Sequence, residues 1–139
     1  MIKIVTYENR HFAGVEALWE EVFPTDSPLN KAAIAIPAKL KVQPDLFIVA
    51  EEAGRVIGTI MAGYDGHRGW LYAVAVQPNH QRTGVGSAML VEAEKRLAQA
   101  GCSKINLQIR AGNEAVSAFY RRHGYIAEER TSMGKRFDR

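Results

Sequence analysis

The chain has 139 residues, of which 47% are hydrophobic and 24% charged, and its formal net charge is +3. A chain of this length is typical of one domain, which we expect to span residues 1–139. Cys102 is the only cysteine, which excludes an internal disulfide and suits a reducing cytoplasm. No segment has the pattern of a signal peptide, and no apolar run is long enough to span a membrane. We therefore expect a cytoplasmic protein with no membrane partner.

The excess of basic over acidic side chains lies in the last third of the chain. Residues 101–139 carry eight basic and four acidic side chains, which could attract a polyanion. However, blocks of like charge are short, and no helix-turn-helix pattern or basic stripe with interleaved aromatic residues is present. We expect no nucleic-acid partner. A nucleic-acid-binding domain stays an alternative, which a steep salt dependence of binding would support.

The N-terminal part of the sequence predicts one strand and two helices. Ile2–Val5 has the pattern of a strand. Apolar residues at helical spacing follow Asn9, which can cap a helix, and Pro24 ends them. Ser27 followed by a proline is typical of a second helix start, and Pro37 makes that helix irregular.

The middle of the sequence predicts three strands in an antiparallel meander. These strands are Leu46–Glu51, Val56–Tyr64 and Trp70–Val76. The dipeptide Asp65-Gly66 is a strong turn signal between the second and third of them.

The remaining sequence alternates between helices and strands. We predict a helix from Gly84 to Gly101, a strand at Ile105–Ile109, a helix from Asn113 to Gly124, and strands at Tyr125–Ala127 and Ser132–Phe137. The order is β-α-α-β-β-β-α-β-α-β-β, in which the strand–helix–strand unit around Gly84 requires one parallel pair. The expected fold class is α/β (α+β), with a mixed, mostly antiparallel central sheet of about seven strands flanked by about four helices.

The spacing Gln81-x-x-Gly84-x-Gly86 lies where a strand runs into a helix. Backbone N–H groups converge in such a turn, and the helix dipole adds positive potential, so the turn suits a pyrophosphate. A P-loop would need Lys-Ser/Thr after the second glycine, where the chain has Ser87-Ala88. A Rossmann fingerprint would need a small residue at Met89. Both of these nucleotide sites are therefore excluded.

A second motif follows downstream and consists of Asn113, Tyr120, Gly124 and Tyr125. Together with the glycine turn after Val74-x-Val76, it resembles the two signatures of the GNAT superfamily of acetyltransferases. Segments 63–69 and 132–136 are similar to those of the bacterial YpeA-type branch. The resemblance implies an N-acetyltransferase that uses acetyl-coenzyme A and no metal, and that transfers the acetyl group by direct attack of a primary amine through a tetrahedral intermediate.

The resemblance also implies roles for individual residues. The exposed backbone of Val74 and Val76 would pair with the pantetheine arm like an added strand, and Ala75 belongs to the same cofactor-binding stretch. An N–H of this strand would also face the thioester oxygen. The pyrophosphate would be held by a run of six residues, Arg82, Thr83, Gly84, Val85, Gly86 and Ser87. Asn113 would bind the arm of the cofactor, and Tyr120 would be the general acid that protonates the departing thiolate.

The general base is the point at which this sequence departs from many protein-directed relatives, which have a glutamate where this chain has Gln108. An amide cannot accept the proton of the amine. The candidates are then Glu51, Glu52, Asp65, His67 or a water chain, and His67 is retained as the second catalytic candidate. We expect a small, amino-acid-like acceptor with an α-amine. A protein N-acetyltransferase and a catalytically silent acyl-coenzyme A-binding module remain alternatives, and a homodimer is left open.

Overall fold

A computed structural model of the protein describes residues 1–137. The chain forms two compact units, Met1–Leu107 and Gln108–Arg139. The first unit contains, in chain order, β1 (Ile2–Thr6), α1 (Phe12–Val22), α2 (Ala32–Leu40), β2 (Phe47–Glu52), β3 (Arg55–Tyr64), β4 (Gly69–Val76), α3 (Val85–Gln99) and β5 (Ile105–Asn106). The second unit contains α4 (Glu114–Arg122).

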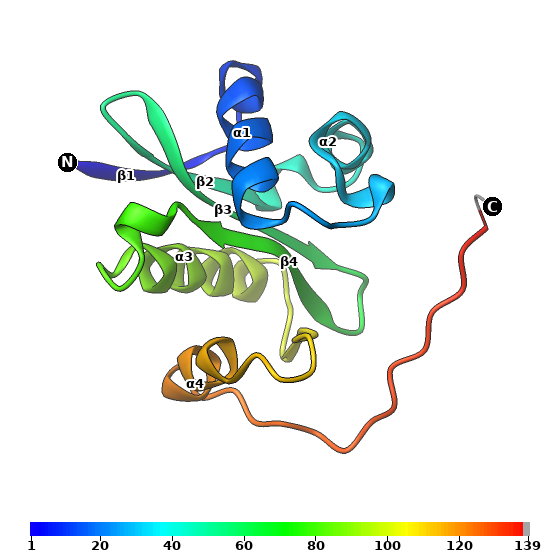
Figure 1. The fold of residues 1–139 in the computed structure, drawn as a ribbon. Coiled ribbons are helices and arrows are strands. Elements are labelled where there is room, and N and C mark those ends of the chain that lie inside the picture. The colour runs from blue at the N-terminus through cyan, green and yellow to red at the C-terminus, as the bar shows by residue number, and fades with distance from the viewer. Residues whose placement is uncertain (138–139) are drawn as a thin grey trace. The chain divides into compact units, whose positions relative to one another are not determined.

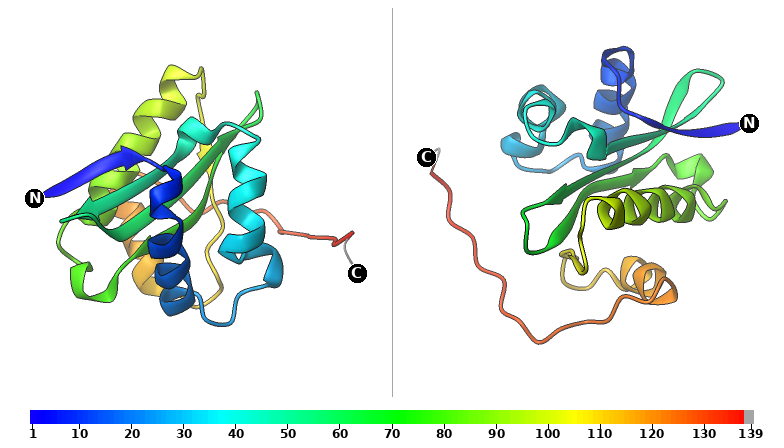
Figure 2. Two further views of the ribbon diagram at one scale, coloured as in Figure 1. Left: turned by 90° about the horizontal axis from the view of Figure 1, so that it is seen from above. Right: turned by 180° about the vertical axis from the view of Figure 1, so that it is seen from behind.

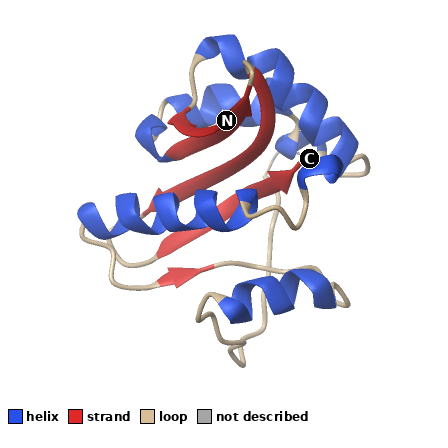
Figure 3. Ribbon diagram, turned by 90° about the vertical axis from the view of Figure 1, so that its left-hand side faces the viewer, coloured by secondary structure: helices blue, strands red, loops and turns tan. Residues whose placement is uncertain are grey.

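The strands, drawn in red in Figure 3, form one sheet. Their order in the sheet is β1-β2-β3-β4-β5. Neighbouring strands are antiparallel except for β4 and β5, which are parallel, as the strand–helix–strand unit predicts. The pairing of β4 with β5 covers only Gly69–Trp70 opposite Ile105–Asn106. The β5 side of the rest of β4 is therefore not paired with a strand.

Helices cover both faces of this sheet. Figures 1 and 2 show α1 and α2 on one face and α3 on the other. Because both faces are covered, β2 is buried almost throughout, from Phe47 to Glu51. On the α3 side, a Cβ on Gly58 would lie 2.8 Å from Met89 Cε, so any larger residue there would require the Met89 side chain to shift. Within residues 1–137, no helix is long and apolar enough to cross a membrane.

The core on the α1–α2 side consists of ten buried hydrophobic residues: Tyr7, Val15, Leu18, Trp19, Ala32, Ile36, Phe47, Val49, Met61 and Ala75. The Tyr7 and Phe47 rings stack with centroids 4.6 Å apart. Most of these side chains come from α1, α2 and the inner strands. This core therefore fixes the position of α1 on the sheet, and α1 carries a residue of the candidate site.

The expectation of about seven strands is not confirmed, because the described residues form a sheet of five. The segments Tyr125–Ala127 and Ser132–Phe137, predicted as strands, have no regular secondary structure, and the strand predicted at Ile105–Ile109 ends at Asn106. A strand is stabilised by the neighbour with which it pairs, and a short run of strand-forming residues does not supply that neighbour. The element order through α4 otherwise follows the prediction.

Candidate active site

Strand β4 carries a β-bulge in its middle. The register with β3 shifts just after Thr59, so that Ala73 and Val74 together stand opposite one residue of β3. Ala73 has a φ of 49°, in the left-handed region that alanine seldom adopts. A bulge bends a strand and changes the direction of its peptide groups. The residues predicted to bind the pantetheine arm, Val74, Ala75 and Val76, therefore begin at this bulge.

Two buried side chains, Thr59 of β3 and Trp19 of α1, form hydrogen bonds that lead to the bulge. The hydroxyl of Thr59, which is 0% exposed, donates to the carbonyl oxygen of Ala73 at 2.8 Å. The same hydroxyl oxygen accepts the indole N–H of Trp19, on α1, at 2.9 Å. A threonine hydroxyl has one donor and two acceptor positions, so both bonds can form together. Helix α1 is thus connected to β4 through one side chain of β3.

Between β4 and α3, the backbone forms a turn with two left-handed residues, Arg82 at φ 65° and Gly84 at φ 91°. Gly84 is the N-cap of α3, and no side chain caps the helix. The first N–H groups of a helix have no acceptor within it, and the helix dipole makes the potential there positive. A Cβ on Gly84 would meet nothing within 4 Å, so the approach to these groups is open. The residues present therefore fit a pyrophosphate.

Local hydrogen bonds hold this turn in shape. The Gln81 side-chain amide donates to the Val76 carbonyl at 3.2 Å, and the Thr83 hydroxyl donates to the His80 carbonyl. His80 Nε2 lies 2.9 Å from a carboxylate oxygen of Glu52. This hydrogen bond lowers the pKa of Glu52. Glu52, one of the candidate bases, is thus engaged in anchoring the turn.

Glu51, a second candidate base, belongs to a partly buried cluster with Arg10 and His11. Its Oε2 lies 2.7 Å from His11 Nε2 and accepts from Arg10 at 3.0 Å. His11 Nδ1 accepts the backbone N–H of Glu8, which places the ring proton on Nε2, facing Glu51. The hydrogen bonds from Arg10, and then from His11, lower the pKa of Glu51. A carboxylate stabilised in its charged form in this way is a weak base.

The turn between β3 and β4 carries the other two candidate bases. One carboxylate oxygen of Asp65 accepts the backbone N–H groups of His67 and Arg68, both at 2.7 Å. These bonds, the one from Arg68 most of all, lower the pKa of Asp65. Asp65 therefore serves the turn itself. His67 is exposed at the tip of the turn, and its catalytic role stays a prediction.

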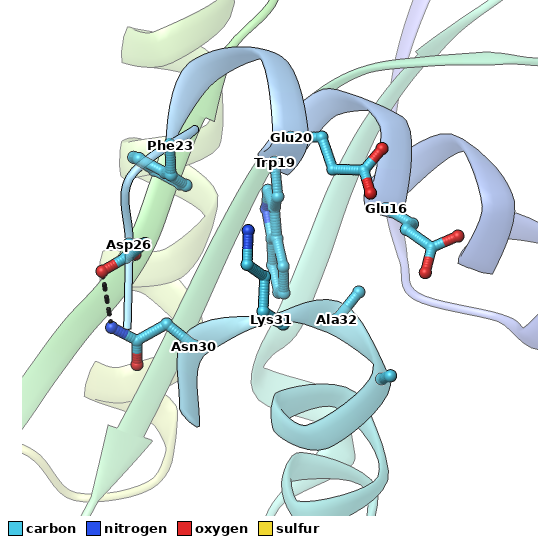
Figure 4. A pocket seen from close by; sticks show the side chains of 9 residues that line it. Glu16, Trp19, Glu20, Phe23, Asp26, Asn30, Lys31 and Ala32 are labelled. Atoms are coloured by element: carbon cyan, nitrogen blue, oxygen red, sulfur yellow. Dashed lines mark hydrogen bonds between the residues drawn. The ribbon is translucent and has the colours of Figure 1, made fainter. Parts of the chain in front are cut away.

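A pocket opens between α1 and the start of α2 (Figure 4). Its lining combines acidic side chains with aromatic rings, and Figure 4 shows the Trp19 ring beside Lys31. The lining consists of Glu16, Trp19, Glu20, Phe23, Asp26, Asn30, Lys31, Ala32 and Ala33. Carboxylates attract an ammonium group, and aromatic faces attract it as well. Since Trp19 also bonds to Thr59, the pocket and the β4 bulge share a residue.

The second unit contains the residues of the downstream motif. The Asn113 side chain caps α4 by accepting the N–H of Val116 at 3.3 Å, as predicted. Tyr120 is 6% exposed, and its burial raises its pKa to about 12. Its ring meets that of Tyr125 edge-on, with centroids 5.4 Å apart. Gln108 is exposed and donates its side-chain N–H to Ser132 Oγ.

The comparisons with known proteins agree with this arrangement. Residues 12–125, which are most of the chain, match the acetyltransferase (GNAT) family. An acetyltransferase of Sodalis glossinidius is 40% identical over 136 residues, covering 97% of this chain and 95% of that protein. The chain therefore belongs to the GNAT acetyltransferase family. The prediction of an enzyme, an acyltransferase that depends on acetyl-coenzyme A, is confirmed by this match and by the named relative.

Solved structures show the same fold. The PaiA N-acetyltransferase of Thermoplasma acidophilum in complex with coenzyme A matches with a TM-score of 0.82 and 18% identity, over 94% of this chain and 93% of that one. The aminoglycoside N-acetyltransferase AAC(6')-Iy in complex with coenzyme A matches with a TM-score of 0.79 and 15% identity, over 99% and 95%. At this identity the likeness defines the fold alone.

Sequence reasoning did not find Thr59, Trp19 and Ala73 as parts of the site. Trp19 could be placed only as one apolar residue of a helix, and Thr59 as one residue of a strand. No local signal marks Ala73, because alanine is not a residue that favours a positive φ. Among residues 1–137, no group of three or more His, Cys, Asp or Glu side chains could hold a metal ion.

Proposed function

We propose that this enzyme transfers the acetyl group of acetyl-coenzyme A to a small compound with an α-amine. The observation that carries the proposal is the succession, within the first unit, of an unpaired β4 edge with a bulge and an uncapped α3 N-terminus. The edge offers N–H and C=O groups to an extended amide chain, as an added strand would. The helix start offers N–H groups to a pyrophosphate. Coenzyme A has both parts in that order.

Individual residues then have the following tasks. The peptide groups of Val74, Ala75 and Val76 bind the pantetheine arm. The turn from Arg82 to Ser87 binds the pyrophosphate, and the backbone N–H groups of Val85 and Gly86 are its main donors. Asn113 contributes a side-chain amide to the arm while it caps α4. The bound thioester supplies the activated acetyl group.

Tyr120 is proposed as the acid that protonates the leaving thiolate. Burial raises the pKa of Tyr120 to about 12, so the phenol keeps its proton at every physiological pH. The raised pKa also makes the phenol a weaker acid than a thiol, whose pKa is about 8.5, so the proton transfer must be coupled to the breaking of the C–S bond and cannot be driven by the free thiolate. The proposal therefore depends on the proton that the phenol retains, and not on its acid strength.

The acceptor amine is proposed to lose its proton to solvent, either directly or through His67. Glu51, Glu52 and Asp65 all have lowered pKa values and structural partners, so they are poor bases. An α-amine, with a pKa near 8, has a sizeable free-amine fraction at neutral pH, whereas a lysine-like amine, with a pKa of about 10.4, has very little. The absence of a strong base among these candidates supports an α-amine acceptor.

The pocket between α1 and α2 supports the same class of acceptor. Its carboxylates, Glu16, Glu20 and Asp26, complement the positive charge of an amine. Lys31 in the same lining can pair with a carboxylate, so the pocket offers both charges that an amino-acid-like compound needs.

A panel of acceptors tests the proposal. Purified protein is incubated with acetyl-coenzyme A and, one at a time, amino acids, polyamines, aminoglycosides and N-terminal peptides, while release of free thiol is followed. We expect the highest kcat/KM with a small α-amine. A preference for a peptide would favour a protein N-acetyltransferase instead. No binding of coenzyme A, measured as thermal stabilisation, or equal stabilisation by ATP, would overturn the assignment of the turn.

A further inference from the structure

The Ala73 carbonyl and the Val74 N–H belong to the same peptide group. Cis peptide bonds are absent from the described residues, so this peptide is trans. In a planar trans peptide the C=O and N–H bonds point in opposite directions. The Thr59 hydroxyl donates to the Ala73 oxygen. The Val74 N–H must then point away from the Thr59 hydroxyl.

We propose that Thr59 and Trp19 are positioning residues, which form a clamp that directs the Val74 N–H toward the acetyl group of the cosubstrate. This inference rests on the proposed function, because it takes the Val74 N–H as the donor that faces the thioester oxygen of the bound cosubstrate. Thr59 does not line the pocket between α1 and α2, and Trp19, whose ring does line it, belongs to the clamp through its indole N–H. Thr59 acts through the peptide between residues 73 and 74, and Trp19 acts through the Thr59 hydroxyl.

The clamp acts on the peptide group between Ala73 and Val74, which other interactions hold only weakly. Ala73 has a φ of 49°, a conformation that costs about 1 kcal/mol or more for a residue with a Cβ and persists only when its surroundings hold it. The ladder between β3 and β4 is interrupted here, so the regular strand bonds do not fix the peptide. The Thr59 hydroxyl is the partner that the structure gives to the Ala73 oxygen.

Trp19 sets the direction in which the hydroxyl of Thr59 donates. The indole N–H can only donate, so it occupies a lone pair of the Thr59 oxygen. The hydroxyl hydrogen is left to face Ala73. Both Thr59 and Trp19 are almost completely inaccessible, at 0% and 3% exposure, so the bond between them is buried, whereas the bond to the half-buried Ala73 is partly buried. The clamp is therefore a chain of two hydrogen bonds that connects α1 to β4.

Substitutions of near-equal shape separate the clamp from simple packing. Thr59→Val removes the hydroxyl and keeps the volume, whereas Thr59→Ser keeps the hydroxyl. A catalytic hydrogen-bond donor of this kind is worth about 10²–10³-fold in kcat, and a misdirected donor loses part of that, so we expect kcat to fall about 10- to 100-fold in Thr59→Val. Thr59→Ser should recover most of the rate. The Kd for coenzyme A should change less than threefold in either variant, because many hydrogen-bond donors contribute to binding and only one of them is misdirected.

Trp19→Phe provides the second arm. Because Trp19 acts through Thr59, the double variant Trp19→Phe/Thr59→Val should have the kcat of Thr59→Val alone, which is a non-additive result. Thr6→Val is the matched control. It removes a hydroxyl of β1 that accepts from Arg96, and it should leave kcat unchanged.

A readout independent of activity tests the clamp itself. In NMR spectra of the labelled protein, the Ala73 carbonyl and Val74 amide resonances should move in Thr59→Val and return in Thr59→Ser, while the dispersion of the other amides shows that the fold is intact. If coenzyme A is added, the Val74 amide should respond in the wild type and less in Thr59→Val. Unmoved resonances in a folded Thr59→Val, or an unchanged kcat, would overturn the clamp while leaving the acetyltransferase intact. A wild type that does not respond to coenzyme A would instead overturn the proposed function.

Discussion

The first unit and the second unit contribute different kinds of chemical group to the proposed reaction. Residues 74–87 of the first unit offer backbone N–H and C=O groups, whose charge does not depend on pH. Residues 108–125 of the second unit offer side chains, Asn113 and Tyr120 above all. Backbone donors can be changed only by distorting the chain, whereas a side-chain function can be removed by a conservative substitution. Binding and proton transfer should therefore respond to different variants.

The largest expected effect is that of Tyr120→Phe. Removal of the phenolic hydroxyl should lower kcat by about 10²–10⁴-fold and leave the Kd for coenzyme A almost unchanged, because a general acid acts in the chemical step. Since burial raises the pKa of Tyr120 to about 12, wild-type activity should not decline between pH 8 and 10 through loss of this proton. Stopped-flow rates and a binding titration measure the two quantities. An unchanged rate with chemistry limiting would make Tyr120 a packing residue.

The next effect separates binding from chemistry in the first unit. Acetyl-coenzyme A at a hundredfold excess over its Kd should stabilise the wild type by about 2.7 kcal/mol, measured by thermal unfolding. Gly84→Val should abolish that gain, because a β-branched side chain would stand in the open approach to the α3 N-terminus and strain a φ of 91°.

Gly54→Val is the matched control for this prediction. Gly54 has a φ of 79° and open space around its Cβ position, so the backbone strain is similar, but it lies on the turn between β2 and β3. The control should lose intrinsic stability and keep the gain from acetyl-coenzyme A. Loss of the gain in both variants would show that strain alone causes it, and would contradict the phosphate-binding role of the turn.

A smaller effect should appear in the pH dependence of the rate. If the acceptor loses its proton to solvent, kcat/KM should rise through neutral pH with the pKa of the acceptor, near 8 for an α-amine, and shift when acceptors of other basicity are compared. Gln108→Glu would add a carboxylate at the position that holds a glutamate in many protein-directed relatives, and should flatten this rise. A profile set by one group near pH 6.5 that His67→Ala abolishes would identify His67 as the base.

The smallest expected effect on the reaction is that of a substitution at Glu51, which belongs neither to residues 74–87 nor to residues 108–125. Glu51→Gln should lower the free energy of unfolding at pH 7 by about 1–3 kcal/mol, because it removes charged hydrogen bonds with Arg10 and His11, and should leave kcat unchanged. The lowered pKa of Glu51 gives stability that is complete above its unfolded pKa of about 4.3 and is lost as the pH falls through the folded value. Urea unfolding from pH 3 to pH 7 should show the variant and the wild type converging at the acid end.

Much of the fold and part of the site could be predicted because they depend on local chemistry. Asn113 caps α4, Asp65 closes the β3–β4 turn, and Gly84 takes the left-handed conformation at the start of α3. Each of these needs only a few neighbouring residues, so the residue types themselves indicate the structure. The parallel pairing of β4 and β5 followed from the order of the elements, because the crossover through α3 returns the chain in the same direction.

Other features were decided only by the tertiary structure. The bulge at Ala73 depends on a hydroxyl that is 14 residues away in the sequence and on an indole 40 residues from that hydroxyl. Strand-like residues at 125–127 and 132–137 do not form strands, because a strand requires a neighbour that the sequence does not specify locally. The sequence by itself therefore determined the glycine turn before α3 and the family. The folded chain decided where the β4 peptide groups point, because that direction depends on contacts between residues far apart in the chain.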